Sequence, residues 1–302
     1  VSLLATFDPK GRLLDHRFTR SIIRVRRQLS YTAVEETYEK EEPLTRLSDL
    51  SQTLRQQRMN QGALNLSLPE LEVRFNPDQT VSLEFIEQDT RARMIVAEIM
   101  ILYNWLAAKF CQDHQIPVLF RTQPEPSEKL PLDEKGYLYY VFQQRRKLSP
   151  LQVQTAPAPH AGLGMPVYTH ATSPIRRYLD LLTQHQLKGA LSGQAPPWDE
   201  KELEEIRLYV EPVIKNVALI KRNRLRYWTL KFLSQHQGGQ FAALVLDELK
   251  RKYRILLEDV LMIADLKRQN GIILSQGQKI RVRVKKADPW EDLLTLEYVK
   301  EA

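Results

Sequence analysis

The chain has 302 residues, of which 43% are hydrophobic, so it is long enough to bury a substantial core and to form two or more compact units. Lys and Arg total 44 against 37 acidic residues, and the formal net charge of +7 is compatible with an anionic partner without identifying one. The single cysteine, Cys111, excludes an intramolecular disulfide and a zinc site made of several cysteines. No apolar run approaches the roughly 20 residues that a membrane helix needs, so we expect a soluble, intracellular protein.

The chain begins with a predicted β-hairpin and two helices. The hairpin covers residues 1–27, with a turn-forming sequence at 8–11. Thr32 and Glu35 have the spacing of a capping box, which predicts the start of the first helix. The second helix is predicted over residues 44–61.

The middle of the chain is predicted to contain two short strands and a long apolar helix. The strands are expected at 64–69 and 81–86, where apolar residues alternate. From residue 90 to 111 apolar side chains recur at helical spacing, which indicates a helix in the core rather than a ligand site. The proline-rich stretch 123–131 is predicted to be a loop.

Two more helices are predicted before the character of the sequence changes. One is expected to begin at Ser173, as its N-cap, and to run to about residue 191. Asp199 and Glu202 form a capping box that opens a long helix, with a kink or restart expected at Pro212. Apolar residues are predicted to share one face of this helix: Ile206, Val210, Val213, Val217 and Ile220.

After residue 239 the apolar pattern changes from helical to alternating. Strands are predicted at 241–246, 253–257, 279–284 and 293–299. Several short antiparallel strands with interleaved basic residues favour a small barrel of the OB type, whose strands and loops commonly bind single-stranded nucleic acid.

The most informative segment lies between the predicted loop and the Ser173 helix. It reads Pro159-His160-Ala161-Gly162-Leu163-Gly164 and then Tyr168-Thr169-His170-Ala171-Thr172-Ser173-Pro174-Ile175-Arg176-Arg177-Tyr178-Leu179-Asp180. The predicted helix N-terminus and the guanidinium groups of Arg176 and Arg177 favour a phosphate. Asp180 follows at helical spacing, so we expect it to pair with one arginine while the other faces outward. Taken alone, a capped helix with solvent-facing arginines would explain a Ser-Pro-x-Arg-Arg sequence equally simply.

This segment closely resembles the signature of the ribonuclease II/R (RNB) family, and it looks most like the cyanobacterial and chloroplast branch. The resemblance continues through Leu29-Ser30-Tyr31, Gly62-Ala63-Leu64, the 95–108 helix and Arg226-Tyr227-Trp228. It implies an α+β fold, with a partial RNB catalytic domain over 1–232 and an OB-type RNA-binding barrel over 237–302. In this family two divalent ions, here taken as Mg²⁺, drive 3′→5′ hydrolysis of single-stranded RNA to nucleoside 5′-monophosphates.

The resemblance also implies roles for individual residues. Arg176 matches the arginine at the scissile phosphate, and Tyr31 the tyrosine that positions the 3′-terminal nucleotide, so both are expected to be catalytic. RNA contacts are expected for Arg177, His160, His170, Ser173, Arg222, Arg226, Phe241 and Tyr253, with Trp290 as a further stacking candidate. The two histidines are not assigned as general bases, because a two-metal mechanism activates water at the ions. Without the resemblance, barrel core and solvated helix faces are the simpler interpretation of these aromatic and basic residues.

The sequence departs from the family pattern in three places. The family's metal-binding aspartate cluster lies upstream of the matched region, and the early aspartates here are scattered: Asp8, Asp15 and Asp49. No metal ligand can therefore be named in this chain. Ala97 stands where many relatives have the first of two adjacent glutamates, which leaves only Glu98, and Arg222 lies near the position of an acidic residue in some relatives.

Three functions stay open on the sequence alone. The favoured one is an exoribonuclease represented by its C-terminal part, which on its own is expected to be inactive. The second is a non-catalytic RNA-binding protein of the same fold, and the third is a DNA-directed or structural module. We expect single-stranded RNA as the partner, a monomer, and a location in the bacterial cytoplasm or in a chloroplast.

Overall fold

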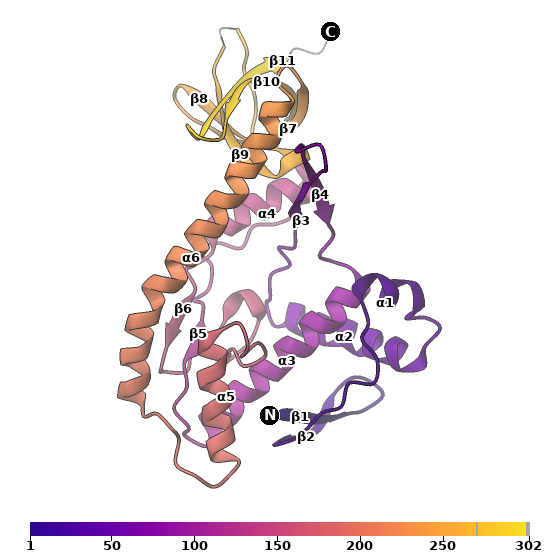
Figure 1. The fold of residues 1–302 in the computed structure, drawn as a ribbon, viewed down its shortest axis with the longest axis vertical. Helices are drawn as coiled ribbons and strands as arrows, with labels where there is room; N and C mark the ends of the chain where they lie inside the picture. The colour runs from indigo at the N-terminus through magenta and orange to yellow at the C-terminus, as the bar shows by residue number, and fades with distance from the viewer. Residues whose placement is uncertain (270, 300–302) are drawn as a thin grey trace. The chain divides into compact units, whose positions relative to one another are not determined.

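The computed structural model describes residues 1–269 and 271–299, and it is an α+β protein. Its contacts divide the chain into two compact units (Figure 1). Unit 1 consists of residues 1–65, 88–127 and 148–212, and unit 2 consists of residues 66–87, 128–147 and those from 213 onward. Each unit is therefore assembled from separate stretches of sequence, whereas the division into 1–232 and 237–302 stays a prediction.

Unit 1 is built from helices, the antiparallel hairpin β1–β2, and the antiparallel strand pair β5–β6. Its elements are β1 (Ser2–Phe7), β2 (Leu13–Thr19), α1 (Tyr31–Thr37), α2 (Glu42–Asn60), α3 (Arg91–Asp113), β5 (Phe120–Thr122), β6 (Gln152–Gln154), α5 (Tyr178–Ala190) and the first part of α6 (Glu200–Gln235). The first hairpin confirms the prediction, except that β2 ends at Thr19. Beyond it Ile22, Ile23 and Val25 alternate as in a strand but are exposed and outside any regular element.

The helix α3 supplies much of the core of unit 1. Thr90 is its N-cap, and Leu106, Ala107 and Cys111 are buried with apolar residues of α2 and β5. By length and by its mean hydropathy of 1.5, α3 could cross a membrane, so the expectation that no run approaches this composition is wrong. In the structure 44% of its most apolar window is buried, as expected for the core helix of a folded domain.

Unit 2 combines a hairpin and a helix with a barrel-like sheet. Its elements are β3 (Glu70–Phe75), β4 (Val81–Ile86), α4 (Gly136–Lys147), the rest of α6, β7 (Gln240–Glu248), β8 (Lys252–Leu257), β9 (Met262–Lys267), β10 (Lys279–Asp288) and β11 (Leu293–Val299). The five last strands form one antiparallel sheet in the order β11-β10-β7-β8-β9. The outer strands β9 and β11 approach each other, so the sheet is nearly closed (Figure 1).

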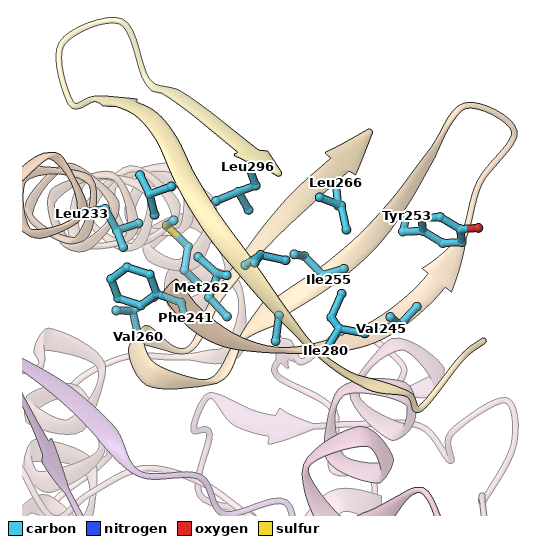
Figure 2. Packing of buried hydrophobic residues seen from close by; sticks show 14 of the residues in the cluster. Leu233, Phe241, Val245, Tyr253, Ile255, Val260, Met262, Leu266, Ile280 and Leu296 are labelled. Carbon is cyan, nitrogen blue, oxygen red and sulfur yellow. The ribbon is translucent and has the colours of Figure 1, made fainter. Parts of the chain in front are cut away.

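The interior of this sheet is filled by side chains that alternate along its strands. In β10, Ile280, Val282 and Val284 are buried, while the intervening arginines point outward. They belong to one buried cluster with side chains from β7, β8 and the end of α6, and Figure 2 shows Ile280 in this cluster with Val245, Ile255 and Leu233. The alternating pattern read from the sequence is therefore the pattern of a packed barrel core.

The start of α1 differs from the prediction. Ser30 is the N-cap, and its hydroxyl accepts a hydrogen bond from the Ala33 amide at 3.1 Å, in place of Thr32. Glu35 does not close the expected capping box, because its carboxylate accepts a hydrogen bond from the Ala92 amide at 2.6 Å. Ala92 is in the first turn of α3, where amides lack partners within the helix, so Glu35 joins α1 to α3.

The first hairpin of unit 2 is shifted from its predicted position. The strand predicted at 81–86 is β4 and is confirmed, but 64–69 is not a strand, and β4 pairs with β3 at 70–75 instead. The register pairs Phe75 with Val81 across the turn, so the partner strand ends next to that turn. Leu71, Val73 and Phe75 alternate with charged residues in β3, a strand pattern that the prediction passed over. The helix α4 and the strand β9 were not predicted.

The helix α6 begins with the predicted capping box and continues as one helix through Pro212. The Asp199 amide donates to Glu202, and the Glu202 amide donates to Asp199, both at 2.8 Å. Val213, Val217 and Ile220, which the spacing places on one face of the helix, are exposed. Helical spacing shows that these residues share a face, and it does not show that another element covers them.

Candidate functional site

A tight turn at residues 160–164 opens the site segment of unit 1. The turn is closed by a hydrogen bond from the His160 amide to the Met165 carbonyl at 2.8 Å. Gly164 has φ of +65°, and a side chain there would place Cβ 2.7 Å from the Arg58 carbonyl oxygen. At Gly162 a Cβ would lie 2.4 Å from the side-chain oxygen of Gln123. Gly164 is therefore required by its backbone conformation and by a close backbone approach, whereas a side chain at Gly162 would have to displace the Gln123 side chain.

A buried ion pair lies next to this turn. Arg58 of α2 donates to both carboxylate oxygens of Glu98 of α3, from Nε at 2.8 Å, and both side chains are almost fully buried. A third bond runs from Arg58 to the Leu163 carbonyl at 3.1 Å. The pair therefore holds the turn against α2 and α3, and both carboxylate oxygens of Glu98 are used in it.

The segment that follows is held by Asn104 of α3. Its amide nitrogen donates to the Tyr168 hydroxyl at 3.0 Å, and its oxygen accepts from the Ala171 amide at 2.9 Å. On the other side the Arg121 amide of β5 donates to the Tyr168 carbonyl at 2.8 Å. All of these groups are buried or nearly so, which fixes the path of the chain up to the two arginines.

The helix after this segment begins later than predicted. α5 starts at Tyr178, and residues 174–176 form a separate turn, with the Arg177 amide donating to the Ser173 carbonyl at 3.0 Å. Ser173 is not the N-cap. Its amide donates instead to the buried carboxylate of Asp180 at 2.9 Å, which draws the chain into a loop. The expectation that Arg176 and Arg177 lie within the first helical turn is therefore wrong.

The two arginines have different environments, as the spacing of Asp180 predicted. Arg177 forms an ion pair with Asp180 at 2.7 Å. Arg176 is exposed, and its guanidinium makes a hydrogen bond of 3.4 Å to the Ser173 hydroxyl. Among the described residues no carboxylate pairs with Arg176. It is thus an outward-facing cation on a turn that Asp180 holds in place.

The histidines of the motif are neutral at physiological pH. Burial, and then the charge of Arg121, lowers the pKa of His160 to about 4. Burial lowers the pKa of His170 to about 3, with further contributions from Arg121 and Arg177. His160 is buried, so its ring presents no surface to RNA, whereas the His170 side chain is 20% exposed. Neither histidine contributes a positive charge to this site.

Tyr31, the other predicted catalytic residue, is the first residue of α1 and is exposed. The guanidinium of Arg93 lies over its ring, 4.4 Å from the centroid. The Tyr31 side chain is 43% exposed, which is close to the half-buried aromatic at a helix start that is expected without the family resemblance. That interpretation and the catalytic role both stay predictions.

In unit 2 the predicted RNA-binding residues separate into core and surface. Phe241 and Tyr253 are buried in the barrel core, so their rings are not available for stacking, contrary to prediction (Figure 2). Arg226 is ion-paired with Asp292, and Arg222 is exposed. Exposed rings lie elsewhere, at Phe75 and Trp290. They end a row of rings in successive edge-to-face contact, hereafter the aromatic row, whose two middle members are half-buried: Phe75, Trp228, Tyr227 and Trp290.

One charged residue of unit 1 was missed by the sequence reasoning. Arg121 lies in the short strand β5, between Phe120 and Thr122, and its side chain is partly buried. Burial is the main cause that lowers its pKa. An arginine directly after a short apolar run is the sequence signal that could have drawn notice to it.

The described residues contain no group of three or more His, Cys, Asp or Glu side chains that could hold a metal ion. We therefore assign no ligand for Mg²⁺ within the described residues, 1–269 and 271–299.

Comparison with known proteins agrees with the family resemblance. A family model described as the RNB domain matches residues 1–132 and 133–193. An uncharacterised ribonuclease of Synechocystis is 33% identical over 305 residues, which cover 97% of this chain and 45% of that protein. The chloroplastic/mitochondrial ribonuclease II of Arabidopsis thaliana is 31% identical over 320 residues, covering 99% of this chain and 39% of that protein. The chain thus spans less than half the length of either relative.

The fold is also that of a solved structure. Ribonuclease R of Mycoplasma genitalium, in complex with ribose-methylated single-stranded RNA, matches with a TM-score of 0.82 and 17% sequence identity. The match covers 98% of this chain and 57% of that protein. At this low identity the likeness concerns the fold alone.

Proposed function

This chain belongs to the RNB family, and we propose that it is part of a 3′→5′ exoribonuclease that hydrolyses single-stranded RNA to nucleoside 5′-monophosphates. Its relatives are ribonucleases, and its fold matches that of a ribonuclease R bound to RNA. The observation that carries the proposal is the exposed Arg176 guanidinium, free of any carboxylate among the described residues, on the family's motif.

Arg176 has the properties that a scissile phosphate requires. A guanidinium can donate two parallel hydrogen bonds to phosphate oxygens and stabilise charge that develops there. The buried Asp180 holds the loop through Ser173 and neutralises Arg177, so it leaves Arg176 as the outward cation. The residues of unit 1 would thus bind and orient the phosphodiester.

Mg²⁺ is proposed for the whole protein, where it would activate the attacking water. The described residues do not offer a ligand set for it, so we derive no step through the ion from this chain. The role of this chain in the reaction is to hold and orient RNA.

The barrel of unit 2 is proposed to bind the RNA strand as an OB-type module. Its aromatic row offers exposed rings for base stacking, and Arg222 is an exposed cation on the neighbouring helix. Stacking on aromatic rings together with phosphate contacts is typical of proteins that bind single-stranded RNA without strong sequence preference.

A bacterial cytoplasm or a chloroplast is the proposed location. One relative is cyanobacterial, and the other is named for the chloroplast and mitochondrion of a plant. The monomeric state expected from the sequence stays a prediction.

The test is an assay of the intact natural protein with an oligoadenylate labelled at its 5′ end. With Mg²⁺ we expect the labelled strand to shorten from its 3′ end and AMP to accumulate, and we expect chelation of the metal to stop both. A DNA strand of the same sequence should stay intact, because the 2′-hydroxyl distinguishes the two polymers.

The second candidate is a non-catalytic RNA-binding protein of the same fold. It is favoured by Ala97 and Arg222, which stand where the family resemblance places acidic residues. Tight binding of the oligoadenylate with no shortening under the same conditions would establish this function and reject the first.

A further inference from the structure

A polar cluster lies beside the site loop of unit 1. We define it by five residues from three segments: Arg121, His160, His170, Arg177 and Asp180. The Arg121 amide is bonded to the Tyr168 carbonyl, and the Tyr168 ring contacts both histidine rings at centroid distances of 5.5 and 5.7 Å. His170 Nδ1 lies 4.0 Å from Asp180 Oδ1.

The cluster contains a positive charge without a counter-charge of its own. Within the described residues no hydrogen bond or ion pair engages the Arg121 guanidinium. The carboxylate that acts on it electrostatically is Asp180, which is already bonded to Arg177 and to the Ser173 amide. Two guanidinium groups therefore face one carboxylate, and the two histidines are neutral. A partly buried cation in this situation favours an anion.

The cluster also has unused hydrogen-bonding capacity. In the described part of the chain five buried side-chain polar atoms lack a hydrogen-bond partner, and three of them belong to this cluster: His160 Nδ1, Arg177 Nε and Asp180 Oδ1. His160 and Asp180 are more than nine-tenths buried. Buried polar atoms are nearly always paired, so hydrogen bonding in this cluster is incomplete. Arg177 Nε lacks an acceptor, whereas Asp180 Oδ1 is itself an acceptor and would not be satisfied by an anion.

The partner must reach the cluster from solvent. The side chains of His170 and Arg177 are 20% and 29% exposed, and Arg121 is only partly buried, so the cluster has an open side. Arg177 is next to Arg176, the residue proposed to hold the scissile phosphate. An RNA strand on this loop would therefore bring further phosphates close to the cluster.

We propose that the Arg121 guanidinium, with Arg177 beside it, forms a second phosphate site, which binds another phosphodiester of the RNA strand that Arg176 contacts. Phosphate oxygens accept hydrogen bonds from both guanidinium groups and supply the missing negative charge. This inference rests on the proposed function, because it requires that the protein bind RNA.

The test compares the salt dependence of RNA binding in the intact protein. Affinity for a labelled oligoadenylate is measured over a series of KCl concentrations, with EDTA present so that the strand is not cleaved. For single strands each phosphate contact contributes about 0.7 to the slope of log affinity against log salt. We expect Arg121→Met, which keeps the apolar stem, to reduce the slope by about 0.7.

Two variants control this measurement. Arg46→Met removes an exposed arginine that is ion-paired with Glu42 on α2, and it should leave the slope unchanged. Arg121→Lys keeps the charge and should keep the slope of the wild type, although the lysine lacks the paired donors of arginine. An Arg121→Met protein that folds and keeps the full slope would overturn the inference while leaving the proposed function intact. A wild type that does not bind RNA would reject the proposed function itself.

A second measurement needs no variant. We expect bound RNA to raise the pKa values of His160 and His170, because a phosphate adds negative charge beside them. The nitrogen resonances of the two rings, recorded over a series of pH values, measure these pKa values. Unchanged pKa values on saturation with the oligoadenylate would contradict the site. A rise with inorganic phosphate but not with RNA would reject the RNA strand as its ligand.

Discussion

The ion pair of Arg58 and Glu98 has the largest structural role of any single contact near the site. It is buried, it joins α2 to α3, and through the Leu163 carbonyl it supports the Gly-Leu-Gly turn. Such a pair gains little over an apolar contact, because both charges lose their hydration. Removing one partner is costly, because the other charge is then left buried and unpaired.

We therefore predict that Glu98→Gln lowers the free energy of unfolding by about 3–5 kcal/mol. Chemical denaturation measures this loss. The control is Glu42→Gln, which breaks an exposed ion pair on the same helix as Arg58 and should change stability little. Replacing both partners, Arg58→Met with Glu98→Leu, should recover most of the loss. If Glu98→Gln were as stable as the wild type, the pair would not have this role.

The residues of the site differ in how well the sequence predicts them. The pairing of Arg177 with Asp180 follows from a spacing of three residues, and the structure confirms it. Arg121 gave no such signal, because its neighbours come from a segment distant in sequence and meet it only through strand pairing with Tyr168. Glu35 was assigned to its own helix for the same reason, since the Ala92 amide that binds it lies in another element.

Elements with a strong local pattern were predicted well. The strand β4, the helix α3 and the capping box of α6 lie where the spacing of apolar residues and the cap residues predicted them. Other elements were displaced or missed: the aromatic-rich helix α4 was not predicted, and β3 was displaced although its apolar and charged residues alternate. The N-terminus of α5 was misplaced because Asp180, a residue beyond it, binds the Ser173 amide.

The aromatic row of unit 2 is made of residues from several elements. Phe75 comes from the β3–β4 hairpin, Tyr227 and Trp228 from α6, and Trp290 from the turn between β10 and β11. Trp290 is 84% exposed, which is unusual for a large ring and leaves it open to a base.

We predict that Trp290→Ala weakens binding of the oligoadenylate by about 1–3 kcal/mol, the usual contribution of one base stacked on an aromatic ring. The slope of affinity against salt should not change, because no phosphate contact is lost. Fluorescence anisotropy gives both quantities. Ile273→Ala, at another highly exposed apolar position of unit 2, is the matched control and should bind normally. Normal binding by Trp290→Ala would exclude the row as a stacking surface.

At the scale of the whole molecule, the sequence reveals the fold class and the family, but not how the chain is divided. Its long motif and alternating C-terminal strands predict an α+β protein of the RNB type, and the family match confirms this. Segments of the two compact units alternate along the chain, so composition and linkers could not mark where each unit begins and ends. The exposed apolar residues of α6 show the same limit, since periodicity does not state what covers a face.

The central claim is that an outward-facing Arg176, held by a loop that Asp180 fixes, binds the phosphate at which RNA is cleaved. The most direct test is the rate of AMP release from single-stranded oligoadenylate by the intact protein and by Arg176→Ala. We predict a fall of about 10²–10³-fold, the usual loss when one stabilising donor is removed, with an unchanged melting temperature and with Arg46→Ala as active as the wild type. Equal rates for Arg176→Ala and wild type would contradict the claim.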